Sequence, residues 1–222
     1  MRTFAILPVK RFDAAKQRLG SALSASARRA LVRAMVHDVL DALDRVRGIR
    51  RIVVVTAEEP VRALAAARGD VVVDDPAQAG QSEAATLGIA AAQRRGAERV
   101  LLVPGDCPAL EPAEVDELLA ERPGAPAVTI VPDRHGTGTN ALLLAPPDAI
   151  APSFGPGSRE RHEQAAGASG ARWRVVEPRS LVLDVDTADD LAVLRAALDA
   201  RTGGAAHTRG LLARLDRHPR RP

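Results

Sequence analysis

The sequence of 222 residues is long enough for one domain with small appendages, and its 46% hydrophobic residues provide a sizeable core. The single cysteine excludes an internal disulfide, and no apolar run approaches the roughly 18 residues of a membrane span. The net charge of +3 is uneven, because residues 201–222 carry +5 and leave −2 for residues 1–200. We therefore expect a cytoplasmic protein that binds neither nucleic acid nor membrane, with a basic, mobile C-terminal tail over 201–222.

Predicted strands and helices alternate along residues 1–200. The first strand, Thr3–Val9, is too short for a signal peptide, and the first helix, Ser26–Arg47, has Ser24 or Ser26 as its N-cap. Further strands are expected at Arg51–Thr56, Asp70–Asp74, Arg99–Val103, Ala127–Pro132, Asn140–Ala145, Trp173–Glu177 and Leu181–Val185. Further helices are expected at Glu59–Ala67, Ser82–Arg95, Pro112–Glu121 and Ala188–Ala200, with a short terminal helix at Leu211–Leu215.

This alternation is typical of a three-layer α/β domain with a mostly parallel sheet. The runs IVVVT and VLLVP are continuously apolar, as expected of strands that are buried on both faces. The strand at Asn140 follows a Gly-Thr-Gly turn, which predicts a hairpin and therefore a mixed sheet. The oligomeric state is left open, with a homodimer as one option.

Two lysines stand among 31 basic residues, and both lie in the loop after the first strand, PVKRFDAAKQRL. Lysine is a compact positive charge that suits a crowded phosphate. Because α/β sheets bind phosphorylated ligands at the carboxyl ends of their strands, Lys10 and Lys16 are candidate phosphate ligands. The alternative is that they are ordinary surface lysines.

Asp106 follows the predicted strand Arg99–Val103 in the segment LLVPGDCPAL. It therefore belongs to the same sheet edge as Lys10, where a carboxylate suits a Mg²⁺ ion that bridges nucleotide phosphates. Alternatively, it closes a turn between two loop-forming residues. Cys107 has no evident His partner and is expected to be a small buried residue rather than a nucleophile.

The segment DRHGTGTNALLL combines glycines with hydroxyl and amide side chains. Gly136 and Gly138 permit close backbone approach to a ligand, and Thr139 and Asn140 supply polar groups. The segment lacks the lysine of a Walker motif, so it is not a P-loop. A plain hairpin turn is the alternative.

The segment FGPGSRERH places Gly155, Gly157 and Ser158 before a predicted helix. Free backbone amides and a hydroxyl at the start of a helix form an anion site, although a simple N-cap explains the same residues. We expect His162 to lie on the surface, since no second histidine lies at metal-ligand spacing.

The segment LVLDVDTADDL carries four carboxylates. Asp184 and Asp186 alternate with Val185, so they face one side and repel unless a cation lies between them. A metal shared with Asp106 or a solvated edge are the two interpretations. Thr187 is a predicted N-cap, and the acidic residues that follow it complement the helix dipole.

Together these segments resemble the 2-phospho-L-lactate guanylyltransferase family, which includes the phosphoenolpyruvate guanylyltransferases of coenzyme F-420 biosynthesis. The resemblance covers roughly residues 3–200 and rests on five motifs in order: PVKRFDAAKQRL, PGDCPAL, DRHGTGTNAL, FGPGSRERH and DVDTADDL. It implies a nucleotide-diphosphosugar-transferase-like (Rossmann-like) α/β fold. It also implies Mg²⁺-dependent transfer of GMP from GTP to the phosphate of a three-carbon acid, with release of pyrophosphate.

The resemblance assigns roles to individual residues. Mg²⁺ would be held by Asp106 and Asp184, with Asp186 as an additional ligand. The GTP triphosphate would be neutralised by Lys10, Lys16 and Arg18, and Lys10, Lys16 and Asp106 would be the catalytic set. The phosphorylated acceptor would be bound by Thr139, Gly155 and Ser158.

One segment departs from the family pattern, because AGQSEAATLG carries Ser82 and Glu83 where a Leu-Asn pair is common near the nucleotide. Ser82 and Glu83 are therefore the candidate nucleotide-binding residues of this segment. Glu83 would accept hydrogen bonds from guanine, or would simply start a helix. The acceptor is phosphoenolpyruvate, 2-phospholactate or 3-phosphoglycerate, and no residue distinguishes them. The rival hypotheses are a molybdopterin guanylyltransferase, a sugar-phosphate cytidylyltransferase and a non-catalytic nucleotide-binding module.

Overall fold

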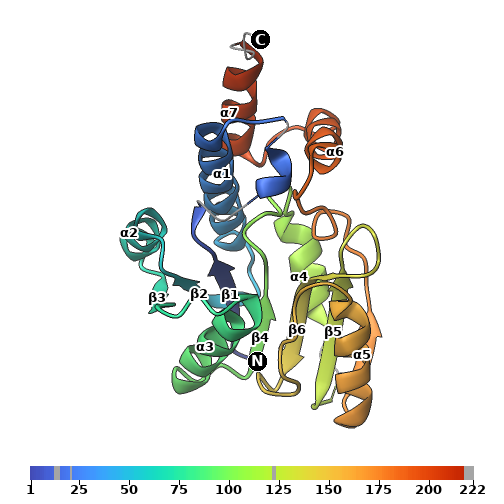
Figure 1. Ribbon diagram of the computed structural model, residues 1–222. Helices are drawn as coiled ribbons and strands as arrows, with labels where there is room; N and C mark the ends of the chain where they lie inside the picture. The colour runs from blue at the N-terminus through green and yellow to red at the C-terminus, as the bar shows by residue number, and fades with distance from the viewer. Residues whose placement is uncertain (13–15, 21, 122–123, 218–222) are drawn as a thin grey trace.

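A seven-stranded sheet forms the centre of the molecule (Figure 1). The structure, a computed structural model, describes residues 1–12, 16–20, 22–121 and 124–217. The strand order is β3-β2-β1-β4-β6-β5-β7. The strands are β1 Thr3–Val9, β2 Ile49–Thr56, β3 Val71–Asp74, β4 Arg99–Leu102, β5 Ala127–Pro132, β6 Thr139–Ala145 and β7 Arg172–Val175. β6 runs antiparallel to β4 and β5, and the other pairings are parallel, so the predicted mixed sheet is confirmed.

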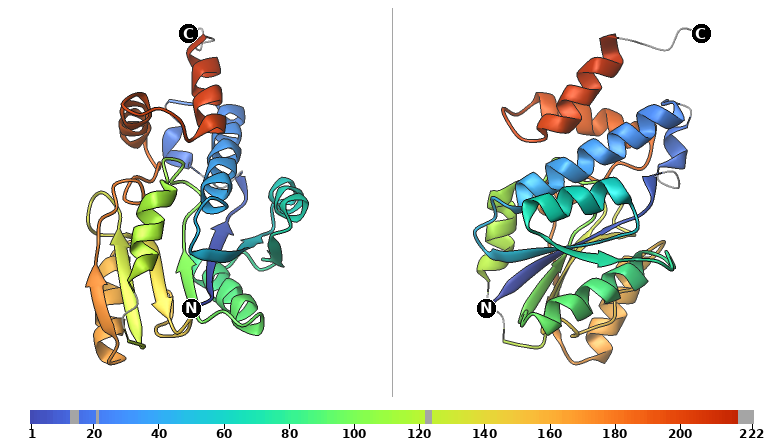
Figure 2. Two further views of the ribbon diagram at one scale, coloured as in Figure 1. Left: turned by 180° about the vertical axis from the view of Figure 1, so that it is seen from behind. Right: turned by 90° about the vertical axis from the view of Figure 1, so that its left-hand side faces the viewer.

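Helices cover both faces of the sheet, as the edge-on view in Figure 2 shows. They are α1 Ala25–Leu43, α2 Glu59–Arg68, α3 Gln81–Arg94, α4 Pro112–Ala120, α5 Ser158–Ala168, α6 Ala188–Asp199 and α7 Ala206–Arg217, with the 3-10 turn η2 Gln17–Leu19. Side chains of α1, α2, α4, α6 and α7 share one apolar cluster, and those of α3 and α5 share another. The predicted three-layer α/β fold is therefore confirmed. None of the described helices is long and apolar enough to cross a membrane.

The central strands are buried on both faces, which explains their continuous apolar sequences. In β1, Ala5 and Leu7 pack into the cluster under α1, whereas Phe4 and Ile6 pack into the cluster under α3. Gly88 lets α3 approach β1 closely, because a Cβ at this position would lie 2.3 Å from Cγ2 of Ile6. The sequence thus brings a helix directly onto the middle of the sheet.

The helix starts follow from side-chain caps. Ser24 Oγ accepts a hydrogen bond from the backbone N–H of Ala27 at 3.1 Å, so Ser24 caps α1. Thr187 and Asp190 form a capping box at the start of α6. Both predicted caps are confirmed, and the second one fixes the loop that carries Asp184 and Asp186.

The strand predicted at Leu181–Val185 is absent, since these residues form turns and irregular backbone. Leu181 and Val185 are nevertheless fully buried in the same cluster as α1 and α6. The apolar alternation that predicted a strand therefore reflects packing against the helix layer. The segment has no ladder partner in the described sheet, whose edge on this side is β7.

The prediction of a mobile tail after residue 200 is wrong for residues 206–217, which form α7 beside α1 (Figure 2). Both oxygens of the buried Asp38 in α1 accept hydrogen bonds from the first turn of α7, from His207 N at 2.9 Å and Thr208 N at 2.7 Å. Leu211 and Leu212 are buried in the main core. The domain therefore continues beyond the predicted boundary, because an apolar face and an acidic cap hold a basic segment in place.

Candidate active site

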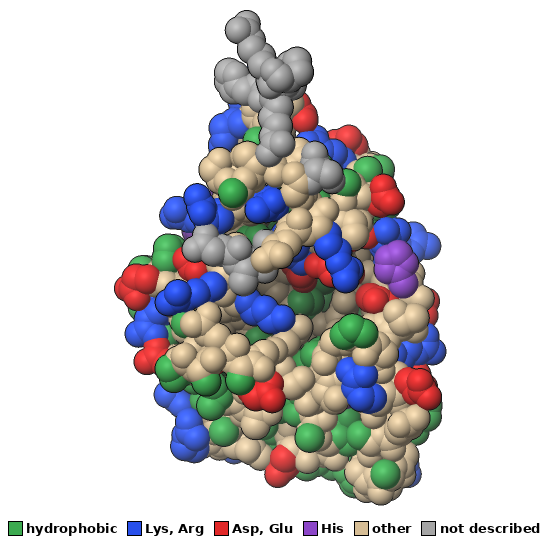
Figure 3. All heavy atoms as spheres, viewed as in Figure 1, with side chains coloured by type: hydrophobic (Ala, Val, Ile, Leu, Met, Phe, Trp, Pro, Cys, Tyr) green, Lys and Arg blue, Asp and Glu red, His purple; other side chains and the backbone are tan. Residues whose placement is uncertain are grey.

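A cavity of about 610 Å³ opens at the edge where the parallel strands end. β6 is antiparallel, so its first residues arrive at the same edge. Figure 3 shows this face hollowed near its middle, with acidic side chains inside the hollow and basic side chains around it. The residues predicted for metal, triphosphate and acceptor binding all line the cavity: Lys10, Lys16, Arg18, Asp106, Thr139, Gly155, Ser158, Asp184 and Asp186. Its size suits a small-molecule substrate.

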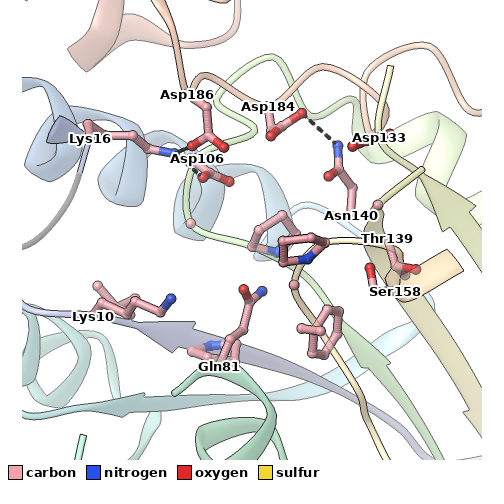
Figure 4. Close-up of a pocket in the computed structure, with 18 of the residues that line it drawn as sticks. Lys10, Lys16, Gln81, Asp106, Asp133, Thr139, Asn140, Ser158, Asp184 and Asp186 are labelled. Carbon is pink, nitrogen blue, oxygen red and sulfur yellow. Dashed lines mark hydrogen bonds and ion pairs between the residues drawn. The ribbon is translucent and has the colours of Figure 1, made fainter. Parts of the chain in front are cut away.

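Three carboxylates converge on one side of the cavity (Figure 4). Asp106 comes from the loop after β4, and Asp184 and Asp186 come from the loop before α6. One oxygen from each lies within 4.8 Å of the others. Within the described chain, Asp106 Oδ1 is buried and has no hydrogen-bond partner. Mg²⁺ prefers carboxylate oxygens of this kind, so the donor set fits this ion.

Lys16 reaches into the same cluster. Its ammonium donates to Asp186 Oδ1 at 2.5 Å and also contacts Asp106 Oδ2, and its side chain is 8% exposed. Burial disfavours the ammonium, but the carboxylates of Asp106 and Asp186 outweigh this effect and raise the pKa of Lys16 above its usual range. Lys16 therefore stays charged and compensates the negative cluster directly.

Asp184 is partly buried in the cluster. Burial, followed by the negative charge of Asp106, raises the pKa of Asp184 to about 6. Asn140 Nδ2 orients it by donating to Asp184 Oδ1 at 3.2 Å and to the carbonyl of Leu181 at 3.0 Å. A cation in this cluster would relieve the repulsion between the two aspartates. Cys107 is fully buried, so the prediction that it is a buried residue is confirmed, and burial raises the pKa of its thiol well above the usual value.

Two hydroxyls lie on the other side of the cavity, at the starts of β6 and α5 (Figure 4). Ser158 is 1% exposed, and its Oγ has no hydrogen-bond partner among the described residues. Thr139 Oγ1 lies 3.0 Å from His162 Nδ1. Gly157, at the N-cap of α5, has φ 69°, a conformation that glycine adopts without strain. The hydroxyls provide donors for an anion, whereas the backbone N–H groups of Ser158 and Arg159 already donate to the carbonyls of Gly155 and Thr137, so the predicted free amides are not found at these two positions.

The prediction that His162 lies on the surface is wrong, because its side chain is fully buried. His162 and Ala166 are four residues apart and form the face of α5 that packs toward the sheet. That spacing was the signal in the sequence that could have indicated burial. The guanidinium of the neighbouring Arg161 is used within the protein, since it donates to Ser153 Oγ at 2.8 Å and to the carbonyls of Ser153 and Phe154.

The remaining wall of the cavity lies between β1 and α3. Lys10 points into it from the end of β1, and Gln81 points into it from the start of α3 (Figure 4). Ser82 and Glu83 do not belong to the described residues that line the cavity, and Ser82 Oγ instead accepts a hydrogen bond from Phe154 N at 2.9 Å. Asp75, which the sequence analysis missed, lines the cavity and is 6% exposed. Its place directly after β3, at the ligand-binding edge, was the available signal.

Comparisons with known proteins agree with this geometry. A sequence model of the family described as "Guanylyl transferase CofC like" matches residues 3–207. A phosphoenolpyruvate guanylyltransferase of Conexibacter woesei is 50% identical over 216 residues, 97% of each chain. The chain belongs to the CofC-like guanylyl transferase family. The resemblance that five ordered motifs indicated is therefore confirmed.

One further curated relative and one solved structure extend the comparison. A 3-phospho-D-glycerate guanylyltransferase of Phenylobacterium zucineum is 38% identical over 202 residues, 89% of this chain and 92% of the relative. A crystal structure from Desulfovibrio desulfuricans, described as a nucleotide-diphospho-sugar transferase, superposes with a TM-score of 0.75 at 19% identity, covering 98% of this chain and 96% of that one. The latter confirms the predicted fold type.

Proposed function

We propose that this guanylyl transferase moves GMP from GTP onto the phosphate of phosphoenolpyruvate and releases pyrophosphate. An oxygen of the acceptor phosphate attacks the α-phosphorus of GTP, and the bond from that phosphorus to the oxygen of the leaving pyrophosphate breaks. The acceptor oxygen is already anionic, so the reaction needs no general base. The barrier is charge repulsion between two polyanions, which positive groups in the site relieve.

The observation that carries the proposal is the pairing, within one cavity, of a carboxylate cluster with the hydroxyls of Thr139 and Ser158, the second of which has no hydrogen-bond partner among the described residues. The cluster of Asp106, Asp184 and Asp186 supports Mg²⁺ binding. Mg²⁺ bound there would neutralise phosphate charge and polarise the phosphorus–oxygen bonds. The hydroxyls of Thr139 and Ser158 support binding of the acceptor anion.

The protein's own cations act on the triphosphate. Lys10 and Arg18 line the cavity, and a GTP placed against the carboxylate cluster would bring its phosphates between them. Lys16 is held by Asp106 and Asp186, and it would exchange one of these carboxylates for a phosphate oxygen when a metal ion binds. The site would thus neutralise the nucleotide from several directions, and the reaction would need none of its residues to act as a general base.

Of the two curated relatives described above, the one with the higher identity favours phosphoenolpyruvate as the acceptor. The relative from Conexibacter woesei carries that name at 50% identity, whereas the 3-phospho-D-glycerate enzyme is 38% identical. Both acids present a carboxylate and a phosphate, so the same hydroxyl donors serve either one. These metabolites and GTP are cytoplasmic, which supports a cytoplasmic enzyme.

The test is pyrophosphate release from GTP and Mg²⁺ with phosphoenolpyruvate, 2-phospholactate or 3-phosphoglycerate, for the native protein and for Asp106→Asn. We expect release that requires phosphoenolpyruvate and falls by at least about 100-fold in the variant, since a ligand for the metal is lost. Release with another acid would reassign the acceptor. Measurable GTP binding without release from any acid would support a non-catalytic nucleotide-binding module instead.

A further inference from the structure

His162 is a buried histidine in direct contact with the candidate acceptor site, and both of its ring nitrogens are engaged. Nε2 accepts a hydrogen bond from the backbone N–H of Ser153 at 2.8 Å. Nδ1 lies 3.0 Å from Thr139 Oγ1. Phe154, which lines the cavity, contacts the ring edge-on at a centroid distance of 5.3 Å. The side chain is therefore fixed on three sides.

These contacts determine the tautomer. A backbone N–H is always a donor, so Nε2 must present its lone pair and carries no proton. Burial, with the nearby charge of Arg161, lowers the pKa of His162 to about 4, so the ring is neutral at physiological pH. The single ring proton then lies on Nδ1. It follows that Nδ1–H donates to Thr139 Oγ1, rather than the reverse.

The direction of that bond leaves the hydroxyl proton of Thr139 unused. The described part of the chain offers Thr139 Oγ1 no second hydrogen-bond partner. The adjacent Ser158 Oγ is likewise buried and without a described partner. Buried polar atoms without partners are rare in folded proteins and indicate a ligand that completes them. Two hydroxyl donors in one wall match a ligand whose oxygens only accept, such as a carboxylate or a phosphate.

We propose that His162 is a positioning residue of the acceptor site, which compels the Thr139 hydroxyl to donate its hydrogen bond into the cavity. This inference rests on the proposed function, because it takes Thr139 as a contact of the acceptor acid. With neither a donor nor an acceptor at the position of Nδ1, the hydroxyl would no longer be held in one orientation. With an acceptor there, it would turn its own proton away from the cavity and present a lone pair to the substrate. An anionic oxygen would then meet repulsion where it now finds a donor.

Two substitutions separate this role from simple packing. His162→Asn keeps an amide donor at the position of Nδ1 and removes the acceptor for Ser153 N–H. His162→Gln places its amide near the position of Nε2 and removes the donor to Thr139. We expect His162→Gln to raise the KM for phosphoenolpyruvate by about 10- to 100-fold, the range for a lost hydrogen bond to a charged group. His162→Asn should recover most of that loss, and the KM for GTP should stay within about twofold in both.

The matched variants at the partner are Thr139→Val, which removes the hydroxyl, and Thr139→Ser, which retains it. If His162 acts through Thr139, the double variant with His162→Gln will be no worse than Thr139→Val alone. Equal losses in the Asn and Gln variants, or additive losses in the double variant, would overturn the inference, as would a native KM for phosphoenolpyruvate in His162→Gln. An unchanged KM for phosphoenolpyruvate in Thr139→Val would instead overturn the acceptor assignment. Thermal melting of each variant identifies any loss that comes from unfolding.

Discussion

Lys16 takes the position that a cation would occupy beside Asp106 and Asp186. The ammonium and a metal ion both neutralise these two carboxylates, so they compete for the same oxygens. The backbone of Lys16 has φ 56°, a left-handed conformation that an L-residue adopts at some cost. The geometry of this residue therefore serves the contact of its side chain with the acidic cluster.

Replacing Lys16 by alanine should make the protein more dependent on Mg²⁺. In metal-free buffer we expect the Tm of Lys16→Ala to fall by about 2 to 10 °C, because hydrogen bonds to charged groups are lost and three carboxylates repel one another. Saturating Mg²⁺ should then raise its Tm by more than it raises that of the native protein, since the competing ammonium is gone.

Thermal melts with and without Mg²⁺ provide the measurement for Lys16→Ala. Lys10→Ala is the matched control, since Lys10 forms no ion pair among the described residues yet lines the same cavity. Mg²⁺ should raise the Tm of Lys10→Ala by as much as it raises the Tm of the native protein. The same stabilisation in Lys16→Ala as in the native protein would show that Lys16 does not compete with the metal.

Asp75 is the residue that we expect to read the guanine base. Guanine presents two adjacent donors, N1–H and the 2-amino group, to which a carboxylate is complementary, whereas xanthine replaces the second donor with a carbonyl. Asp75→Asn should therefore lower kcat/KM for GTP by about 10- to 100-fold relative to that for xanthosine triphosphate. Steady-state pyrophosphate release with each nucleotide measures the ratio.

The control for Asp75 is Glu83→Gln, because the sequence left Glu83 either as a guanine contact or as the start of a helix. Glu83 is exposed and lies outside the described lining of the cavity, so its variant should retain the native preference for GTP. A change of preference in Glu83→Gln, with none in Asp75→Asn, would restore the original assignment.

The residues of the candidate site were predictable from the sequence to different extents. Lys10, Asp106 and Asp184 follow strands or precede a helix, so the topology of an α/β sheet brings them to one edge. The places of His162 and Asp75 in the site were not predicted, because they depend on burial, which short polar motifs do not reveal. The contact between Lys16 and Asp186 joins residues 170 positions apart and needs the folded chain.

At the scale of elements, the first turns of α5 form hydrogen bonds to two loops, the turn before β6 and the segment that precedes α5. Arg159 donates from its backbone to the carbonyl of Thr137 at 3.2 Å and from its guanidinium to the carbonyl of Gly136 at 3.3 Å. Arg161 and His162 hold the segment that starts at Ser153. The motif FGPGSRERH therefore supplies two arginines that are used internally, and it leaves Ser158 to face the cavity.

A second link joins the turn after β5 to the carboxylate loop. Arg134 Nε donates to Asp190 Oδ1 at 2.5 Å, and Asp190 Oδ2 accepts from the backbone of Asp186 at 3.0 Å and of Thr187 at 2.7 Å. From the sequence, the acidic residues after Thr187, of which Asp190 is one, were expected only to complement the helix dipole. In the folded protein the same carboxylate also fixes the backbone of Asp186. It therefore links the turn after β5 to the loop that carries the carboxylate cluster.

The connection between α2 and β3 contains a carboxylate that destabilises the protein at neutral pH. Asp70 Oδ2 is buried without a hydrogen-bond partner among the described residues, and its nearest cation, Arg68 Nε, is 3.4 Å away. Burial raises the pKa of Asp70 to about 6, against an unfolded value near 3.9. The folded state thus binds a proton more tightly, and stability from this group falls as pH rises from about 4 to 6.

Asp70→Asn removes this pH dependence. The difference in unfolding free energy between Asp70→Asn and the native protein should become more favourable to the variant from about pH 4 to 6, and level off above. Urea denaturation across that range is the measurement. Asp116→Asn is the control of opposite sign, because hydrogen bonds from Gly48 N–H and Arg47 outweigh burial and lower the pKa of Asp116. Parallel curves for both variants would refute the assignment.

At the scale of the whole molecule, the order of elements and the three layers were predictable because periodicity and turn residues report them locally. The strand predicted at Leu181–Val185 failed since apolar alternation does not distinguish packing in a sheet from packing against helices. The prediction of a mobile tail failed because amino-acid composition does not distinguish arginines that are exposed to solvent from arginines that bind the fold. Arg209 donates to the carbonyls of Gly204 at 3.0 Å and Arg201 at 2.9 Å, so it stabilises the fold.

The integration of α7 changes what truncation should do. A free tail could be removed at residue 200 without effect, whereas removal of α7 would expose the apolar surface under Leu211 and Leu212 and leave the buried Asp38 carboxylate without its two donors. We therefore expect a chain that ends at residue 200 to be recovered mostly as unfolded or aggregated protein.

Point variants make the same argument without truncation. Leu212→Ala should cost about 2 to 5 kcal/mol of unfolding free energy, because a buried side chain leaves a cavity. Arg217→Ala, at an exposed position one turn and a half further along α7, should change it by less than about 0.5 kcal/mol. Denaturant titrations of the two variants are the measurement, with GTP-dependent pyrophosphate release below the transition as a readout of the site. Equal unfolding free energies of the two variants would mean that α7 does not contribute to the core and that the basic segment is an appendage.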